Sequence, residues 1–354
     1  MKNESALELR PRVLLTGGSG FLGRAILSEI LDPSSPLPVK EVVILDLAPF
    51  KGMNNPRIRP VRGDIRNREV VDEITKGIDL VIHSAAIVDW GTSPEKEVYS
   101  INEAGTRNIL EACRRNGVKA LVFTSSLDVL HNGDPLVNVD EEAPYPEEHS
   151  NAYCGSKCAA EKLVIESNNP DFQTCSLRPA DIYGEWDPYH LGPLIQMARR
   201  GFYVRLGNGM SRCQHVYVGN VAYAHLLAAR ALLNGNSTVA GNSYFITDCE
   251  GSNFFTFFDR IIEGAGYRIR PKNLWLPRWF AYGLGSISEL FAFLLRPVRQ
   301  YTPKMSRFAV TYTCTDYTFT SEKARNDFNF TPKYSQEEAL ERTVNHFRND
   351  NSAG

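Results

Sequence analysis

The sequence predicts an α/β protein built on a doubly wound parallel sheet, with a smaller lobe toward its C-terminal end. Residues 12–123 alternate short β-branched runs with amphipathic stretches, an order typical of a parallel sheet covered by helices on both faces. After about residue 185 this alternation thins, and aromatic residues, prolines and glycines become more frequent. We therefore expect a sheet body over residues 10–185 and a lobe over 186–350, interleaved with the sheet because no low-complexity linker separates them.

The elements of the sheet body follow one another in regular order. Strands are expected over 12–16, 41–46, 57–63, 79–85 and 120–126, with helices over 21–31, 67–77 and 98–117. Gly117 is a plausible C-terminal stop for the third helix. A further helix should begin near Asn151, followed by a strand over 172–179 and a helix over 221–233. Right-handed crossovers between these elements produce the doubly wound topology.

Composition excludes several classes of protein. The 354 residues carry 39 Lys and Arg against 41 Asp and Glu, a net charge of −2, whereas a nucleic-acid binder is normally more basic. With 43% hydrophobic residues the chain is neither disordered nor a coiled coil. Seven scattered cysteines, never spaced as CxxC, fit the reduced thiols of a cytoplasmic protein, and the first twelve residues lack the apolar core of a secretory signal.

A glycine-rich turn follows the first strand directly. Gly17, Gly20 and Gly23 form a GxxGxxG pattern that includes Phe21 and Leu22 and opens a helix. The first glycine permits a tight turn, the second lets the backbone approach a pyrophosphate, and the third allows close packing of helix and strand. In this strand-turn-helix context the pattern predicts a dinucleotide-binding Rossmann domain.

Other strand ends supply the remaining cofactor contacts. The second strand ends at Asp46, where a carboxylate accepts both adenosine-ribose hydroxyls and repels a 2′-phosphate, so NAD is favoured over NADP. Asp64 and Ile65 are placed to meet the adenine, and the small residues Ala85 and Ala86 let the backbone approach the riboses. For His83, at the end of the fourth strand, we expect a hydrogen-bonded histidine without a chemical role.

Tyr153 and Lys157 carry the strongest chemical signal. Four residues apart on a helix, they share one face at a separation of about 5–6 Å. A neighbouring ammonium and the positive nicotinamide ring favour the phenolate, which lowers the pKa of Tyr153 and lets it take a hydroxyl proton as hydride leaves. Lys157 is also expected to hold the nicotinamide ribose, so both residues count as cofactor contacts. At the end of the fifth strand Ser126 should orient the substrate oxygen, with Ser125 the alternative.

These motifs together resemble the extended short-chain dehydrogenase/reductase superfamily. Residues 178–184, 215–222, 294–297 and 319–340 look more narrowly like the 3β-hydroxysteroid dehydrogenase branch. The resemblance implies NAD-dependent oxidation of a 3β-hydroxyl on a steroid or sterol to a ketone. It also implies that Pro179 and Ile182 line the nicotinamide end and that Asn102 supports the catalytic lysine through water.

Two features bear on the reaction that the resemblance implies. Branch members that also shift the ring double bond carry adjacent aspartates after the strand matching 244–247, whereas this chain has Asp248, Cys249 and Glu250, which leaves isomerase activity open. The related sterol-4α-carboxylate 3-dehydrogenases stop at oxidation, after which the β-keto acid loses carbon dioxide. In that alternative, Arg205 or Arg212 would pair with the carboxylate, although either arginine can equally be structural.

An apolar segment over residues 274–295 carries only two charges, Arg278 and Glu289. Lys272, Arg296, Arg299 and Lys304 lie beyond its ends. The segment is barely long enough to span a bilayer, and Pro277 argues against a clean span. It is therefore interpreted either as an interfacial helix at a membrane surface or as a helix that covers the substrate pocket. The first interpretation predicts peripheral attachment to the cytosolic face of a membrane, the endoplasmic reticulum in a eukaryotic cell.

Two rival functions remain beside the dehydrogenase. A nucleotide-sugar epimerase or dehydratase uses the same residues but needs a polar, arginine-rich diphosphate site, which the aromatic region after residue 274 does not suggest. A nonenzymatic NAD-sensing regulator of the same fold typically lacks the tyrosine or lysine, and this chain keeps both. The expected partners are a steroid or sterol substrate and a second copy of the chain in a homodimer.

Overall fold

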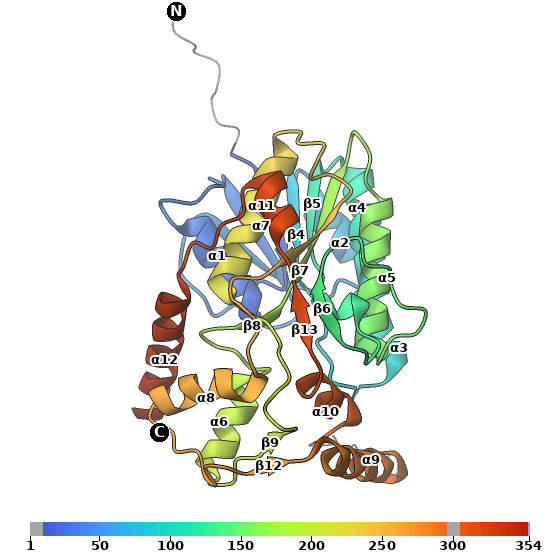
Figure 1. The fold of residues 1–354 in the computed structure, drawn as a ribbon. Helices are drawn as coiled ribbons and strands as arrows, with labels where there is room; N and C mark the ends of the chain where they lie inside the picture. The colour runs from blue at the N-terminus through green and yellow to red at the C-terminus, as the bar shows by residue number, and fades with distance from the viewer. Residues whose placement is uncertain (1–9, 92, 296–304, 353–354) are drawn as a thin grey trace, which may run out of the picture.

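A computed structural model describes residues 10–91, 93–295 and 305–352, which form a central parallel sheet with helices on both faces (Figure 1). The seven strands run in the order β11–β7–β5–β4–β1–β2–β3. Their bounds are β1 (Arg12–Thr16), β2 (Glu41–Asp46), β3 (Ile58–Arg62), β4 (Leu80–His83), β5 (Ala120–Thr124), β7 (Gln173–Pro179) and β11 (Ser243–Ile246). The order reverses between β1 and β4, which confirms the doubly wound fold and places a crevice at the carboxyl ends of these strands.

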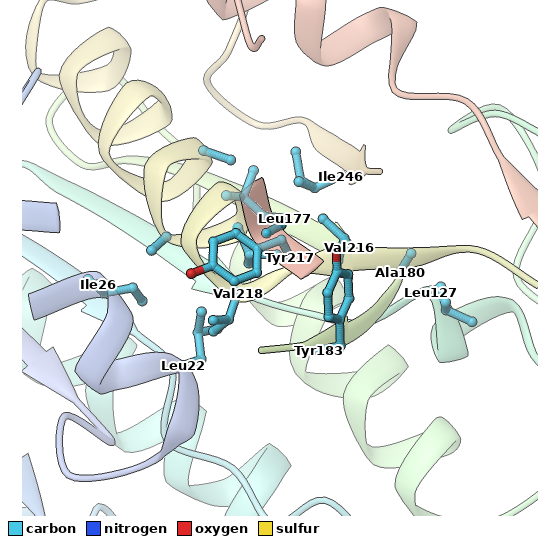
Figure 2. Close-up of a cluster of buried hydrophobic side chains, with 14 of the residues drawn as sticks. Leu22, Ile26, Leu127, Leu177, Ala180, Tyr183, Val216, Tyr217, Val218 and Ile246 are labelled. Carbon is cyan, nitrogen blue, oxygen red and sulfur yellow. The ribbon is translucent and has the colours of Figure 1, made fainter. Parts of the chain in front are cut away.

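Helices cover the sheet in two layers. α1 (Phe21–Leu31) and α7 (Val218–Leu233) pack together on one face, whereas α2 (Arg68–Thr75), α4 (Gly105–Asn116) and α5 (Ala152–Glu166) pack on the other. Figure 2 shows side chains of the cluster on this face, among them Leu22 and Ile26 from α1, Leu177 from β7 and Ile246 from β11. The sheet is therefore buried on both faces, as its continuous β-branched strands predict.

Most elements of the sheet body begin and end near their expected residues. The bounds of β1, β2 and α1 agree with the sequence expectation. Asn151 caps α5 by accepting a hydrogen bond from the Cys154 N–H at 2.9 Å, and Gly117 ends α4 in a left-handed conformation with φ 68°. The single helix expected over 98–117 is instead α3 (Glu95–Tyr99), a π-helical turn (Ser100–Ala104) and α4. The π turn carries Asn102, whose side chain is bonded into the interior.

The second lobe is made of short elements that pair with distant parts of the chain. Its helices are α6 (Leu191–Arg199), α8 (Phe254–Gly264), α9 (Arg278–Leu295), α10 (Arg307–Thr313), α11 (Glu322–Phe328) and α12 (Gln336–Ser352). Three parallel strand pairs accompany them: β8 (Asp181–Tyr183) with β10 (His215–Tyr217), β9 (Arg205–Leu206) with β12 (Trp275–Leu276), and β6 (Leu136–Val139) with β13 (Tyr317–Phe319). Both α7 and β11 follow residue 185 and yet belong to the sheet body.

The apolar segment forms α9 at the far end of the second lobe (Figure 1). Its small residues Ala281 and Gly285 are buried on the side that meets α10, whereas Ile287, Phe291 and Leu294 are 53–60% exposed. Within the described ranges no helix combines the length and apolar character that crossing a bilayer requires. The flanking Arg296, Arg299 and Lys304, and Pro297 of the family-like motif, lie outside the described residues.

Candidate active site

A cavity of about 540 Å³ opens at the carboxyl edge of the sheet and extends toward α10. Every cofactor contact expected from the sequence lines it, together with both candidate serines. These residues are Gly17, Gly20, Phe21, Leu22, Gly23, Asp46, Asp64, Ile65, Ala85, Ala86, Ser125, Ser126, Tyr153, Lys157, Pro179 and Ile182. The structure thus brings the glycine turn and the tyrosine–lysine pair to one cavity.

The turn between β1 and α1 has the close backbone contacts that its glycines predict. Gly17 has φ +75°, and a Cβ atom at this position would lie 2.9 Å from the backbone of Ala85. At Gly23 a Cβ atom would lie only 2.1 Å from the Gly17 carbonyl oxygen, so helix and turn pack too closely for any larger residue. α1 begins immediately after Gly20, and its first residues line the cavity, a position suited to an anion.

The two acidic residues of the cofactor half differ in their partners. Asp46 accepts hydrogen bonds from the backbone N–H groups of Ser19 and Ala48, each at 2.9 Å, and so fixes the turn beside the end of β2. Asp64 is paired with Arg66, whose guanidinium lies 2.6 Å from the carboxylate and lowers the pKa of Asp64. Arg66 was not anticipated from the sequence, and it occupies the carboxylate expected to meet the adenine.

Lys157 is buried beneath the cavity, where its ammonium contacts a backbone carbonyl and an aromatic ring. Its Nζ donates a 2.5 Å hydrogen bond to the Thr124 carbonyl oxygen and lies 4.2 Å from the centre of the Phe123 ring. Burial lowers the pKa of Lys157 to about 7, against the carboxylates of Glu161 and Asp128, which raise it. The ammonium is therefore close to losing its proton near neutral pH.

Tyr153 does not have the lowered pKa that its neighbouring lysine suggested. Burial raises the pKa of its phenol well above the usual value, and the Asp128 carboxylate raises it further, whereas a hydrogen bond with Ser126 lowers it. Desolvation disfavours the charged form more strongly than the protein's own cations favour it. The phenol is therefore neutral in the protein without its cofactor, and the expected phenolate, which depends also on the positive nicotinamide ring, stays a prediction.

Of the two candidate serines, Ser126 is the one that hydrogen-bonds with Tyr153. It is the residue that caps a short 3-10 helix (Leu127–Leu130). Its hydroxyl donates to Asp128 Oδ2 at 2.7 Å and accepts from the Asp128 N–H at 3.2 Å. Ser125 also lines the cavity and is buried. The choice of Ser126 over Ser125 stays a prediction.

Two further polar residues hold the floor of the site. The Asn102 side chain accepts from the Ile87 N–H at 2.9 Å and donates to Ser156 Oγ at 3.0 Å, so it braces the helix that carries Tyr153 and Lys157. His83 is fully buried between the hydroxyls of Thr16 and Thr106, and burial lowers its pKa to about 3. A neutral, hydrogen-bonded His83 agrees with the structural role expected from the sequence.

The far end of the cavity is made of residues that the sequence did not single out, namely Trp90, Asp128, Asp181, Tyr189, His190, Phe308 and Tyr312. The Trp90 ring meets the edges of Phe308 and Tyr312 at centroid distances of 5.8 and 5.5 Å. The Tyr312 hydroxyl donates to Asp181 at 2.5 Å. Burial opposes charge on His190, but the carboxylates of Asp187 and Asp181 raise its pKa to about 9.

The arginines considered for a substrate carboxylate lie elsewhere. Arg205 pairs with Asp259 at 2.8 Å and donates to the Lys272 carbonyl, and Arg212 donates to the Gly251 carbonyl. Among the described residues that line the cavity there is no arginine, and none comes from the segment 274–295. α10 and Trp90 form this wall of the cavity, and the two interpretations of the segment stay predictions.

A family model and two similar sequences all relate this chain to 3β-hydroxysteroid and sterol dehydrogenases. A sequence model of the 3-beta hydroxysteroid dehydrogenase/isomerase family matches residues 14–278. Mouse sterol-4-alpha-carboxylate 3-dehydrogenase, decarboxylating, is 32% identical over 334 residues, which cover 94% of this chain and 89% of the relative. Human 3 beta-hydroxysteroid dehydrogenase type 7 is 34% identical over 357 residues, which cover 94% of each chain.

Solved structures with the same fold are more distant in sequence. A double mutant of dTDP-glucose 4,6-dehydratase from Streptomyces venezuelae, with NAD bound, superposes with a TM-score of 0.75 at 19% identity and covers 97% of this chain and 98% of its own. UDP-glucose 4-epimerase from Thermotoga maritima, with UDP-glucose, gives 0.72 at 20% identity, covering 96% and 99%. These likenesses show the fold of the chain.

Proposed function

The chain belongs to the 3-beta hydroxysteroid dehydrogenase/isomerase family, and from this premise we propose that it oxidises the 3β-hydroxyl of a steroid or sterol to a ketone with NAD. As a member of this family it is an oxidoreductase that acts on CH–OH groups. The observation that carries the proposal is the convergence of Ser126, Tyr153 and Lys157 with the glycine turn in one cavity.

The cavity fits a dinucleotide. The glycine turn leaves its backbone open where a Cβ atom would clash, α1 begins at the cavity wall, and Asp46 stands at the end of β2 for the ribose. Pro179, Ile182 and Lys157 line the end near Tyr153, where the nicotinamide belongs. NAD, when bound, supplies a hydride acceptor and a positive ring that favours the Tyr153 phenolate.

The protein's own groups then handle the proton and the oxygen. Tyr153 takes the proton of the substrate hydroxyl, and Ser126 donates to the oxygen as negative charge develops on it. Lys157, fixed by the Thr124 carbonyl, holds the nicotinamide ribose and provides the nearby positive charge. The C–H bond breaks in the same step, and its electron pair leaves with the hydride.

The wall of the cavity supports a ring-shaped, apolar substrate without a diphosphate. Trp90, Phe308 and Tyr312 present aromatic surface to the far end. The lining residues in the described ranges include no arginine that would bind a nucleotide sugar or a 4-carboxylate. A 3β-hydroxysteroid without an acidic group is therefore the first choice. Oxidation of a sterol 4α-carboxylate is the alternative, supported by the likeness to the mouse enzyme of that name.

A substrate panel tests the proposal. Purified protein is incubated with NAD and 3β-hydroxysteroids, 4-carboxysterols or UDP-glucose, while the absorbance of reduced cofactor and the sugar products are followed. We expect NAD reduction with a 3β-hydroxysteroid. Turnover of only the nucleotide sugar, or of nothing, would reject the proposed substrate class.

The variant Tyr153→Phe tests the assigned base. It should lower kcat at least about 100-fold, because proton transfer is lost, while the Kd for NAD changes little. Cys154→Ser, which alters the neighbouring residue on α5, serves as the matched control and should remain active. Wild-type turnover by Tyr153→Phe would exclude this residue as the base.

We also propose that α9 rests on a lipid surface. Phe280, Leu284, Ile287, Phe291 and Leu294 follow one another at helical spacing and form one exposed apolar face. The opposite face is buried against α10. A helix with this division of faces lies flat at a membrane surface, which supports peripheral attachment to the cytosolic side of a membrane such as the endoplasmic reticulum.

Flotation with phosphatidylcholine and phosphatidylserine vesicles tests this attachment. Wild-type protein should float with the vesicles, and the double variant Ile287→Gln, Phe291→Gln should not. Val137→Gln, which removes an exposed apolar side chain from β6, is the control and should float. Wild-type protein that stays at the bottom of the gradient with every vesicle composition would contradict the proposal.

Light scattering of the purified protein checks the expected homodimer.

A further inference from the structure

Asp128 lines the cavity and is in contact with Ser126, one of the proposed reacting groups. Its Oδ2 accepts the Ser126 hydroxyl proton at 2.7 Å, and its N–H donates to the same hydroxyl at 3.2 Å. Its other carboxyl oxygen, Oδ1, is buried and has no hydrogen-bond partner among the described residues. The side chain also lines the cavity in which Tyr153 lies. The roles proposed above for Ser126, Tyr153 and Lys157 leave this carboxyl without a function.

A serine hydroxyl has a single proton to donate. When Ser126 gives that proton to an ionised Asp128, only its lone pairs remain for another group. During the oxidation, negative charge develops on the substrate oxygen as its proton passes to Tyr153, and a hydrogen-bond donor must stabilise that charge. A Ser126 proton held by Asp128 is not available for this purpose.

We propose that Asp128 is a positioning residue whose protonation directs the Ser126 hydroxyl: the neutral acid leaves the serine proton free for the substrate oxygen, and the carboxylate withdraws it. This inference rests on the proposed function, because it concerns the same reaction. A protonated Asp128 can itself donate to Ser126 Oγ, so the hydroxyl stays oriented while its proton points to the substrate. Hydride transfer in both directions shares one transition state and therefore needs the neutral form.

Charged and titratable groups reach Asp128 from several elements. They are Tyr153, Cys154 and Lys157 on α5, Asp181 on β8, His190 before α6, Tyr312 on α10 and Tyr317 on β13. Burial raises the pKa of Asp128 to about 7, the hydrogen bond from Ser126 lowers it, and the Asp181 carboxylate raises it. The buried, unpaired Oδ1 also favours the neutral acid.

The direction of the pH effect follows from these groups. Below the pKa of Asp128 the acid is neutral and the Ser126 proton is free, whereas above it the carboxylate holds the proton. Wild-type kcat for steroid oxidation should therefore fall on the alkaline side of the pKa of Asp128. Removal of the Asp181 charge should lower the pKa of Asp128 and shift this fall to lower pH.

Steady-state oxidation of a 3β-hydroxysteroid over a range of pH tests the inference. Asp128→Asn cannot ionise, so its kcat should not fall on the alkaline side, and its ratio of kcat at pH 9 to kcat at pH 7 should exceed the wild-type ratio at least fivefold. Asp128→Glu should restore the fall. Asp171→Asn, which removes an exposed carboxylate from a turn before β7, is the control with a wild-type profile. An unchanged alkaline fall in Asp128→Asn overturns the inference.

Two further measurements decide the matter where Asp128→Asn does not fold or where no substrate turns over. In active protein, Asp181→Asn should shift the alkaline fall to lower pH, and an unmoved fall overturns the inference. In any folded protein, infrared difference spectra should show a protonated carboxyl that titrates near neutral pH. Ser126→Ala should raise the pH of that titration, because the serine hydrogen bond is lost. An unshifted titration contradicts the coupling, whereas an inactive wild type with the expected shift rejects only the proposed function.

Discussion

Asp46 has two tasks at the residue scale, because its carboxylate both holds the glycine turn and faces the cofactor cavity. Its two oxygens accept from the Ser19 and Ala48 N–H groups, and Arg62 is fixed nearby by donating to the Leu47 carbonyl. A 2′-phosphate at this position would meet a negative carboxylate. Cofactor choice thus depends on a residue that also shapes the turn.

Replacement of Asp46 should change the preference between cofactors. Asp46→Ala removes the acceptor for the ribose hydroxyls and the repulsion of a 2′-phosphate, so we expect kcat/KM for NAD to fall at least about tenfold and the NAD-to-NADP ratio to narrow. Asp46→Asn keeps a hydrogen-bond acceptor for the turn but removes the negative charge, so it separates the effect of the charge from the effect of the hydrogen bonds. A wild-type ratio in Asp46→Ala would show that the ribose lies elsewhere.

The protonation of buried groups shows what the sequence could not predict at this scale. The positions of Tyr153, Lys157 and Ser126 follow from local motifs, and all three lie in the cavity. Their pKa values depend instead on burial, which raises that of Tyr153 and lowers that of Lys157 to about 7. Desolvation comes from the packing of many distant residues, so the spacing of tyrosine and lysine could not predict how strongly burial opposes the phenolate.

His83 provides a pH test of this burial. Its pKa is about 3 in the folded protein against 6.5 unfolded, so between these values the unfolded chain binds more protons and acid destabilises the fold. His83→Gln lacks this pH-dependent contribution to the free energy of unfolding. The stability difference between wild type and variant should shrink by about 2 kcal/mol between about pH 7.5 and pH 5 in urea unfolding. A difference that stays constant with pH would mean that His83 has the same pKa in the folded protein as in the unfolded chain.

At the scale of elements, the turn before α1 is defined by steric contact. A Cβ atom at Gly23 would lie 2.1 Å from the Gly17 oxygen and 2.6 Å from the Gly18 Cα, both backbone atoms that cannot yield. At Gly20 the nearest contact would be 3.2 Å, also to the Gly17 oxygen. The third glycine of the pattern therefore tolerates substitution least.

Alanine substitutions should rank accordingly. Gly23→Ala should lower the free energy of unfolding by about 3 kcal/mol or more through overpacking, and it should abolish NAD binding because the turn must open. Gly117→Ala meets no atom within 4 Å and should cost only about 1 kcal/mol for its left-handed φ of 68°. Urea unfolding measures both values. Equal effects at the two positions would contradict the packing argument.

The elements that could be predicted from the sequence are those with a regular pattern of apolar residues. The strands and helices of the sheet body have several apolar residues at a regular period, and most were located from it. The pairs β8–β10 and β9–β12 have two or three residues each, too few to show a period, and their partners are distant in sequence. The far end of the cavity was missed for the same reason, since Trp90 and Phe308 meet across more than 200 residues of chain.

On the scale of the whole molecule, the two lobes share one hydrophobic core. A single cluster of buried side chains extends from Val13 in β1 to Phe347 in α12, and it includes residues of α7 and α8. Strand β11 adds the second half of the chain to the edge of the sheet. A second cluster of buried side chains, from Leu14 to Phe172, lies within the sheet body alone, so the second lobe contributes to the first cluster and not to the second.

The shared core predicts one cooperative unfolding transition. Far-ultraviolet circular dichroism reports mainly on the sheet body, whereas tryptophan fluorescence reports on Trp275 in the second lobe and on Trp90 in the cavity wall. The two signals should give coincident unfolding curves in urea. Two separated transitions would show that the lobes are independent domains.

Saturating NAD, at about 100 times its Kd, should add about 2.7 kcal/mol to the free energy of unfolding.

A pair of contacts joins the outermost helix to the wall of the cavity. Arg307, at the start of α10, donates its N–H and its Nε to Glu289 of α9 at 2.7 and 2.6 Å, and the next residue, Phe308, lines the cavity. An α9 seated on lipid would therefore hold the far-end wall of the cavity near the surface in which an insoluble sterol is dissolved. Such an enzyme obeys surface dilution, so its apparent KM should follow the mole fraction of substrate in the vesicles and be insensitive to the volume of buffer around them.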